Sequence, residues 1–414
     1  MLHGLKKFLK KIKFVRKLYY RLRMNVSIPE VICITPRQSE NSREMRLNIL
    51  VPSIQTNHTF GGVSTALSFF ERMADELGVK RRIVCIDVSV SEKDMANFPG
   101  YCHVRWNDDL SAERQVLCVS KNADETFPVW EGDIFITTAW WTEYNLLPVL
   151  KWQSAVYDRP ILNHIYLIQD YEPGFYPWST HYMLAESTYR SEPPAIAVFN
   201  SRLLKDYFAN NGYRFEHAFY FDPVMNPKLS VHISKEESIK KEKKILVYGR
   251  PSVSRNAFEM IVEALKLWVL TMEGSHEWSL VSVGEEHRNV DLGNGCVLKS
   301  MGKLSLKEYA DTMKAAHAGI SLMVSPHSSY PPLEMSTFGV KTITNSYANK
   351  DLSNFNRNII SLKDCTAQTI CKELKAVCSC YTGDGSYCIN EKYINPKVDE
   401  IGEIIKQIKA IGLC

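Results

Sequence analysis

The sequence predicts an α/β protein with two doubly wound, Rossmann-like halves facing a cleft. Short apolar segments alternate with segments of helical periodicity from Arg46 onward, which is typical of a parallel sheet covered by helices on both faces. The same alternation begins again after a charged run at 235–244. The 414 residues, 45% of them hydrophobic, suffice for two domains of ordinary size.

The first 24 residues form a separate unit. They contain nine Lys or Arg residues and no acidic residue, and apolar residues recur among them at helical spacing. We expect a basic amphipathic helix on an anionic membrane surface; a solvated or partner-packed helix would show the same pattern. The rest of the chain has 41 basic and 46 acidic residues, so the net charge of +4 does not indicate nucleic-acid binding.

Residues 25–45 are expected to be a linker, and the first half follows at 46–234. Its expected strands lie at 46–54, 82–88, 133–139, 164–169 and 195–200, and its helices at 64–77, 144–153 and 201–209. The second half is expected at 235–396. Its strands are predicted at 245–248, 279–283, 297–300, 319–324, 341–345 and 359–362, and its helices at 257–272, 306–316, 332–338 and 366–379. A last helix is expected at about 398–411. Two such halves bind ligands in the cleft between them.

The stretch at 322–345 has the strongest chemical signal. Pro331 and Pro332 follow a Ser-rich loop and predict the start of a short helix. The N–H groups of a first helical turn bind anions, and Glu334 in that turn is well placed to accept hydrogen bonds from the two hydroxyls of a ribose. A carboxylate that only interacts favourably with the helix dipole would leave the same pattern.

Three cationic residues follow strands of the same predicted sheet. Arg250 and Arg255 lie in the turn after the strand at 245–248, beside Gly249, which lets the backbone approach a ligand. Lys303 follows the strand at 297–300. Because Arg presents a planar fork of donors to phosphate oxygens, we expect the three to bind a diphosphate. Each taken alone could be an ordinary surface charge.

The first half contributes a glycine turn, Gly61-Gly62, and aromatic segments after two strands. Aromatic faces with interspersed carboxylates suit sugar rings, although core packing is the alternative. We expect Asp170 and Glu172 to orient an acceptor rather than to deprotonate it. The candidate acceptor-binding residues are Phe60, Trp140, Trp141, Asp170, Tyr171, Glu172, Tyr176 and Trp178.

Four segments, FGGVSTAL, YLIQDYEPGFYPW, YGRPSVSRNAF and SPHSSYPPLEMSTFG, carry a resemblance that covers 46–410. The chain resembles the WsaF-like rhamnosyltransferases of glycosyltransferase family 4, which extend bacterial rhamnose polysaccharides and S-layer glycans. The resemblance implies a GT-B fold, an acceptor-binding domain at 46–234, a nucleotide-sugar domain at 235–396, and a last helix, 397–414, packing back on the first domain. It implies retaining transfer from dTDP-L-rhamnose to a polysaccharide or lipid-linked glycan, with no metal and no cofactor.

The resemblance also assigns roles to residues. Glu334 takes the place of a ribose-binding glutamate, and Arg250 and Arg255 take the places of diphosphate-binding Arg and Lys. Arg250 and Lys303 are the candidate catalytic residues, since fixed cations can stabilise the charge on a departing phosphate. The candidate donor-binding residues are Gly61, Gly62, Gly249, Arg250, Arg255, Lys303, His327, Tyr330, Pro331, Leu333 and Glu334.

One departure leaves the donor sugar open. Pro326, followed by His327, stands where the general clan has a first glutamate eight residues before the second. The same fold using GDP-mannose or a UDP-sugar, a nucleotide-sugar epimerase or hydrolase, and a silent polysaccharide-binding scaffold are the alternatives. The joint presence of Arg250, Arg255, Lys303 and Glu334 disfavours the scaffold.

Composition disfavours several other classes. No apolar run reaches the roughly 18 residues that span a bilayer, and no secretory signal is recognisable. Eleven scattered cysteines fit reduced thiols, so we expect a cytoplasmic protein, peripheral at the inner face of the cell membrane. The cysteines at 365–388 form no C-x-x-C pair, and the chain has no D-x-D, complete G-x-G-x-x-G or P-loop motif.

Overall fold

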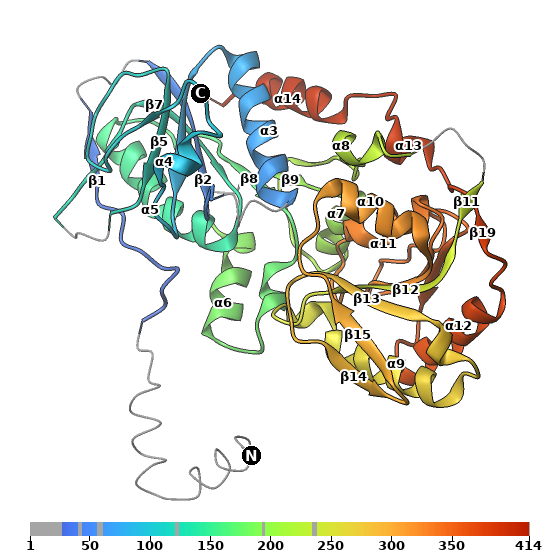
Figure 1. The fold of residues 1–414 in the computed structure, drawn as a ribbon. Helices are drawn as coiled ribbons and strands as arrows, with labels where there is room; N and C mark the ends of the chain where they lie inside the picture. The colour runs from blue at the N-terminus through green and yellow to red at the C-terminus, as the bar shows by residue number, and fades with distance from the viewer. Residues whose placement is uncertain are drawn as a thin grey trace, which may run out of the picture.

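The computed structural model describes residues 27–39, 44–55, 61–120, 124–192, 195–233 and 238–413. Two α/β halves, each built on one large sheet, lie side by side (Figure 1). This confirms the predicted fold class. The expected membrane helix at 1–24 and the candidate Phe60 lie outside the described residues.

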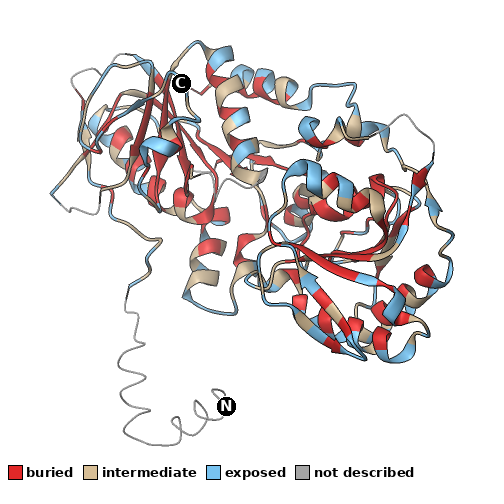
Figure 2. Cartoon of the chain, viewed as in Figure 1, coloured by how far each residue is buried: buried red, intermediate tan, exposed pale blue. Residues whose placement is uncertain are grey.

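The N-terminal sheet has eight strands in the order β10-β9-β8-β7-β2-β3-β5-β4, and neighbouring strands are all parallel. The last six residues of β2 are all buried, as expected of a strand covered on both faces (Figure 2). The strands are β2 (Met45–Val51), β3 (Lys80–Cys85), β4 (Cys102–His103), β5 (Arg114–Cys118), β7 (Gly132–Thr137), β8 (Ile165–Ile168), β9 (Ile196–Phe199) and β10 (Ala218–Tyr220).

Helices flank this sheet, and a small parallel pair, β1 (Pro36–Gln38) and β6 (Phe127–Val129), lies beside it. The helices are α3 (Gly61–Leu77), α4 (Glu92–Met95), α5 (Trp140–Val156), α6 (Thr180–Ser187) and α7 (Arg202–Asn210), with 3₁₀ turns η1 (Glu172–Phe175) and η2 (Thr188–Arg190).

A buried ion cluster joins the amino ends of three central strands of this sheet. Asp133 on β7 accepts hydrogen bonds from Arg46 Nε on β2 at 2.7 Å and from Arg82 Nη2 on β3 at 3.2 Å. All three side chains are fully buried. Asn48 also donates to Asp133, at 2.9 Å, so the carboxylate is fully engaged.

The C-terminal sheet has the order β14-β15-β13-β12-β16-β17-β18, parallel throughout except for β14 against β15. After β12 the chain adds strands on the β13 side and then returns to the β16 side. The winding therefore reverses between β12 and β16, which is where doubly wound sheets bind ligands. The strands are β12 (Glu242–Gly249), β13 (Ser279–Gly284), β14 (Val290–Gly293), β15 (Cys296–Ser300), β16 (Ala316–Ile320), β17 (Lys341–Asn345) and β18 (Ile359–Leu362).

A two-stranded antiparallel pair, β11 (Ile239–Lys240) and β19 (Asp384–Gly385), borders this half. Its helices are α8 (Pro227–Ser230), α9 (Phe258–Thr271), α10 (Leu306–Ala315), α11 (Tyr330–Thr337), α12 (Ala367–Ser379) and α13 (Glu391–Ile394), with 3₁₀ turns η3 (Ser254–Asn256) and η4 (Ser275–Glu277).

The last helix, α14 (Glu400–Ile411), leaves the C-terminal half and lies against α3 of the N-terminal half (Figure 1). Ile404, Ile405 and Ile408 are buried in the N-terminal core. Lys409 Nζ donates to the Glu76 carbonyl at 3.0 Å at the end of α3. The chain therefore crosses between the halves twice.

Three boundaries differ from the predictions in ways that matter for the site. Strand β16 ends at Ile320, so 321–329 is a loop and not part of a strand. Helix α3 begins at Gly61, which puts both glycines inside its first turn. Helix α11 begins at Tyr330, so Glu334 lies one residue beyond the first turn.

Candidate donor site between the two halves

Beyond Ser321, whose N–H still donates to the Ile343 carbonyl of β17 at 3.0 Å, the loop at 321–329 is held largely by side chains. Asn345 accepts from the Met323 N–H at 2.7 Å and donates to the Met323 carbonyl at 3.0 Å. Lys350 Nζ donates to the same carbonyl at 2.6 Å. The Val324 N–H donates to the Arg255 carbonyl at 2.7 Å, so the loop runs beside the turn after β12. It therefore lies at the switch point of the sheet.

His327 in this loop has a fixed tautomer. Its Nδ1 accepts from the Ser329 N–H at 3.0 Å, so we assign the proton of the neutral imidazole to Nε2. That Nε2 is buried and has no hydrogen-bond partner among the described residues. Burial lowers the pKa of His327. Ser329 has φ 63°, an uncommon conformation for serine that this hydrogen bond helps to hold.

Glu334 on α11 lies among tyrosine side chains. Burial raises the pKa of Glu334 to about 7, and the neighbouring Tyr309 hydroxyl opposes this only in part. Tyr248, Tyr330 and Tyr393 are also close: burial raises the pKa of each, and the Glu334 charge raises it further. A carboxylate that is costly to ionise in such a setting gains much from new hydrogen-bond donors.

The predicted cations follow β12 and β15. Arg255 in η3 has its guanidinium 4.0 Å from the centre of the Phe175 ring, and its Nε 3.5 Å from Asp170 Oδ2, both in the N-terminal half. Burial lowers the pKa of Arg255, while Asp170 raises it. Arg250 directly follows β12, close enough to affect the pKa of Tyr248. Lys303 lies exposed between β15 and α10.

Gly249 and Gly62 have packing reasons to be glycine. A Cβ on Gly249 would lie 2.2 Å from Ser282 Oγ, and a Cβ on Gly62 would lie 2.1 Å from Gln169 Oε1. Gly61 and Gly62 start α3, and Thr65 in the next turn hydrogen-bonds the Tyr330 hydroxyl. The start of α3 therefore faces the start of α11, where Pro331 and Leu333 are buried.

Asp170, predicted to orient an acceptor, contacts the C-terminal half instead. Its Oδ1 accepts hydrogen bonds from the Ser325 hydroxyl and, at 2.8 Å, from the Tyr171 N–H. The side chain is 7% exposed. The structure thus brings Asp170, Arg255 and the loop at 321–329 together.

Two models of one family match the chain: "WsaF, N-terminal domain" over 46–202 and "WsaF, C-terminal domain" over 243–375. The chain belongs to the WsaF family. The curated O-antigen biosynthesis protein RfbC of Myxococcus xanthus is 25% identical over 326 residues. These cover 75% of this chain but 24% of RfbC, so the chain spans about a quarter of that relative's length.

Solved structures show the fold of the WsaF-family chain. TarM of S. aureus, solved with UDP and glycan ligands, superimposes with a TM-score of 0.52 at 7% identity, over 89% of this chain and 97% of TarM. Sucrose-phosphate synthase of Thermosynechococcus elongatus gives 0.51 at 10% identity, over 89% and 96% of the two chains. The WsaF-family chain therefore has the GT-B fold, as predicted.

The predicted acceptor residues of the WsaF-family chain divide into buried and exposed ones. Trp140 is fully buried, and its Nε1 donates to the Tyr176 hydroxyl at 3.0 Å, so no face of its indole is open to a sugar. Glu172 is also buried, and its carboxylate accepts a hydrogen bond from the backbone N–H of Trp140 at the start of α5. Burial raises the pKa of Glu172 to about 8. These two side chains serve the fold of the N-terminal half, which corrects their predicted place in an acceptor surface.

The other aromatic candidates keep different degrees of access. The Tyr171 hydroxyl lies 2.9 Å from that of Tyr213 within an aromatic cluster. Trp141 is partly exposed, with Nε1 donating to Asp87 at 2.9 Å. Trp178 is 91% exposed and stacks on Tyr182 with 5.2 Å between ring centres. Trp178 is thus the aromatic candidate most open to a ligand.

Lys350, Asn345, Gln169 and Tyr309 also belong to the site, and sequence analysis missed them. Lys350 sits in the polar stretch NSYANKD, which looks like a surface turn, and nothing in its neighbours reveals that the lysine is buried. Asn345 ends a predicted strand and could have been suspected from that position alone.

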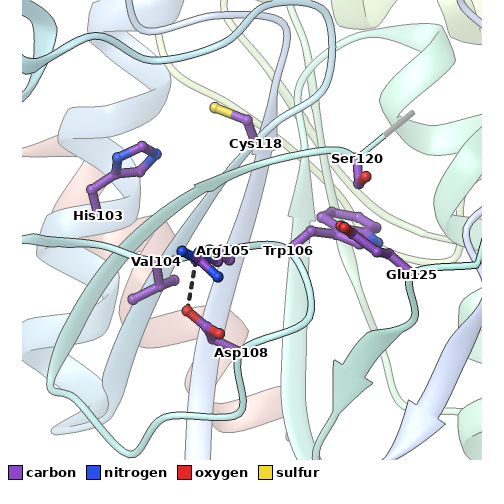
Figure 3. Close-up of a pocket in the computed structure, with 8 residues that line it drawn as sticks. All are labelled: His103, Val104, Arg105, Trp106, Asp108, Cys118, Ser120 and Glu125. Atoms are coloured by element: carbon purple, nitrogen blue, oxygen red, sulfur yellow. Dashed lines mark hydrogen bonds between the residues drawn. The ribbon is translucent and has the colours of Figure 1, made fainter. Parts of the chain in front are cut away.

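Two cavities in the WsaF-family chain lie elsewhere. One of about 490 Å³ is at the edge of the N-terminal sheet, where the Arg105 N–H donates to Asp108 at 2.9 Å (Figure 3). It is lined by His103, Val104, Arg105, Trp106, Asp108, Cys118, Ser120 and Glu125. One of about 190 Å³ lies near the start of β17. Neither includes a predicted site residue.

Two features are absent from the part of the chain that the structure describes. None of the helices in this part is long and apolar enough to cross a membrane. No cluster of three or more His, Cys, Asp or Glu side chains with the geometry to hold a metal ion occurs among the described residues.

Proposed function

We propose that this WsaF-family protein is a glycosyltransferase that moves a rhamnosyl group from dTDP-L-rhamnose to a rhamnose-containing polysaccharide or lipid-linked glycan, with retention of configuration. The observation that carries the proposal is the convergence of Arg250, Arg255, the loop at 321–329 and Glu334 at the switch point of the C-terminal sheet. The relative RfbC, an O-antigen biosynthesis protein, and the UDP bound to TarM support a nucleotide-sugar donor and a glycan product.

Glu334 is the proposed ligand of the donor ribose. The side chain is partly buried among tyrosines, and burial raises its pKa to about 7, so its ionised form would gain from further hydrogen-bond donors. Two ribose hydroxyls donating to it would compensate for that lost hydration. Tyr330, Pro331 and Leu333 at the start of α11 then form the wall beside the nucleotide.

Arg250, Arg255 and Lys303 are the proposed ligands of the diphosphate. Departure of the sugar leaves new negative charge on the β-phosphate, and cations fixed beforehand stabilise that charge without reorganising. Arg250 and Lys303 would act on the leaving phosphate, and Arg255 would assist from η3. This accounts for turnover without a metal or a cofactor, which remains part of the proposal.

A catalytic base is dispensable under the retaining mechanism, because the leaving phosphate oxygen can take the acceptor's proton on the same face. The buried Glu172 fits this view, since its carboxylate already accepts the Trp140 N–H. On the sugar side, Pro326 replaces a carboxylate, and His327 offers a neutral N–H donor instead. The donor sugar is the least constrained part of the proposal, with GDP-mannose or a UDP-sugar as the alternatives.

Trp178 and residues 1–24 are the proposed contacts with the acceptor and with the membrane. Exposed Trp178 stacked on Tyr182 offers an aromatic face for a glycan chain. Residues 1–24, with nine cations, would attach the enzyme peripherally to the anionic inner face of the cell membrane, where a lipid-linked acceptor would be found.

The test is incubation of the protein with a panel of nucleotide sugars, including dTDP-L-rhamnose, GDP-mannose and UDP-sugars, with and without a rhamnose-terminated acceptor. Mass spectrometry should show one rhamnosyl added to the acceptor, from dTDP-L-rhamnose alone. Equal donor consumption without the acceptor would favour a nucleotide-sugar hydrolase or epimerase. Transfer from another donor would keep the enzyme class and reject the rhamnosyl assignment.

A further inference from the structure

Lys350 is a buried cation that the proposed mechanism does not use. It lies on the turn after β17, is 1% exposed, and donates to the Met323 carbonyl at 2.6 Å. Asn349, the residue before it, donates from Nδ2 to the Leu203 carbonyl of α7 in the N-terminal half at 2.8 Å. This turn therefore lies where the two halves meet.

Asp170 of the N-terminal half lies beside Arg255, and its charge also acts on Lys350. Asp170 Oδ2 is 3.5 Å from Arg255 Nε, yet that Nε has no hydrogen-bond acceptor among the described residues. Burial lowers the pKa of Lys350 to about 8, and the charge of Asp170 opposes this only in part. His327 adds no positive charge, because burial favours its neutral form.

Glu172 also acts on Arg255, but burial raises the pKa of Glu172 to about 8, so this carboxyl carries little charge at pH 7. The two buried cations therefore share the charge of Asp170 alone, and a positive charge is left unbalanced. Buried charges are costly unless they are paired and hydrogen-bonded. The Lys350 ammonium has three N–H groups, and the Met323 carbonyl takes one of them. The missing partner is an anion with more than one charge and several acceptor oxygens, which is the chemistry of a diphosphate.

We propose that Lys350 is a further ligand of the donor diphosphate, and that Asp170 holds Lys350 and Arg255 in position until the diphosphate replaces it. The inference rests on the proposed function, because it concerns the same donor site. Asp170 would then compete with the donor phosphates, and the Asp170–Ser325 contact would tie the two halves together in the absence of donor.

Two simpler roles, one for Asp170 and one for Lys350, predict different changes in binding. If Asp170 oriented the acceptor, its replacement by Asn would leave phosphate binding unchanged. If Lys350 only supported the Met323 carbonyl beside Asn345, its replacement would weaken the binding of a nucleoside as much as that of a nucleoside diphosphate, and would lower thermal stability.

The experiment is calorimetric titration of the full-length chain with inorganic pyrophosphate, dTDP and thymidine. Lys350→Met should weaken binding of pyrophosphate and dTDP by about 10-fold or more, the effect of one lost hydrogen bond to a charged group, with thymidine binding unchanged. Asp170→Asn should strengthen pyrophosphate binding by roughly 3-fold or more. The matched control is Lys341→Met, a lysine on β17 whose Nζ donates to Asn358 at 2.8 Å and which should change nothing.

Lys350→Arg keeps the charge and should retain most of the pyrophosphate affinity, which provides a test even if Asp170→Asn fails to fold. If the wild type binds pyrophosphate and Lys350→Met leaves this affinity unchanged, or Asp170→Asn weakens it, the inference is wrong and the proposed function stands. Failure of the wild type to bind pyrophosphate, dTDP, UDP or GDP would overturn both.

Discussion

Replacement of Glu334 by Gln should have opposite effects on binding and on stability. In the folded protein burial raises the pKa of Glu334 from its ordinary value of 4.5 to about 7. Between these two pH values the unfolded chain loses the proton and the folded chain keeps it. The carboxyl therefore destabilises the fold progressively as pH rises from about 4.5 to 7, and its full cost is present above pH 7.

The size of this cost follows from the shift. The shift from 4.5 to about 7 is about 2.5 pH units, which corresponds to at most about 3.5 kcal/mol at about 1.4 kcal/mol per unit. Glu334→Gln removes the titration and keeps the shape, so it should raise the melting temperature at pH 8 and change it little at pH 4.5. For a chain of this size a gain of about 2 kcal/mol is a few degrees.

The same substitution should weaken donor binding at pH 8. Loss of a charged acceptor for the ribose hydroxyls should cost roughly 1.5–3 kcal/mol, which is about 10-fold or more in the dissociation constant of dTDP. In the wild type, affinity for dTDP should rise from pH 6 to pH 8 as Glu334 ionises; in the variant this rise should disappear.

Thermal unfolding at pH 4.5 and 8, with calorimetric titration of dTDP at pH 6 and 8, checks these expectations. Glu259→Gln, at an exposed position in the first turn of α9, is the matched control and should show neither effect. Equal changes in melting temperature at both pH values would refute the burial argument. Unaltered dTDP affinity in folded variant protein would remove Glu334 from the donor site.

The remaining predictions concern the cations, the membrane segment and the buried ion cluster. Arg250→Ala or Lys303→Ala should lower turnover by about 100-fold, and EDTA should not change the turnover of the wild type. Strict dependence on Mg²⁺ or Mn²⁺ would contradict this. The control is Lys299→Ala, at an exposed position on β15. Removal of residues 1–24 should preserve turnover of a soluble acceptor and abolish co-sedimentation with anionic vesicles, since each cation near such a surface is worth about 1 kcal/mol; unchanged co-sedimentation would reject the membrane role. Asp133→Ala should lower the free energy of unfolding, measured by denaturant titration, by about 3–5 kcal/mol, because it leaves Arg46 and Arg82 buried without their carboxylate. Asp206→Ala, at a side chain that is about half exposed, is the control and should have little effect.

The two-sheet fold was predictable because buried parallel strands leave long apolar segments in the sequence. The strands Lys341–Asn345 and Ile359–Leu362 were predicted to the residue, as both are short apolar runs bounded by polar turns. The segment after Ile320 misled the prediction. LMV looks like more of the same strand, but its backbone bonds to Asn345, Lys350 and the Arg255 carbonyl. Periodicity cannot reveal side chains that replace a neighbouring strand.

The site was predictable where residues lie in unusual local sequence, and less so where burial decides their role. Glu334, Arg250 and Arg255 stand in distinctive segments after strands, and the structure places them at one edge of the C-terminal sheet. Trp140 and Trp178 both follow the same compositional pattern, yet one is fully buried and the other 91% exposed. That difference depends on the packing of α5 against η1 and α6, which involves residues more than 30 positions apart in sequence.

The position of Asp170 in the structure differs from what its sequence context suggested. Its sequence context, QDYEPGFYPW, placed it beside aromatic residues and so suggested a role toward the acceptor. In the structure its carboxylate bonds to Ser325 and lies beside Arg255, both of the opposite half. If Arg255 and Lys350 bind the donor diphosphate as proposed, the Asp170 carboxylate opposes donor binding unless it moves away from Arg255. If it does move, donor binding and the contact between the halves are linked through one side chain, and the sign of the Asp170→Asn effect on pyrophosphate affinity separates this linkage from a role in orienting the acceptor.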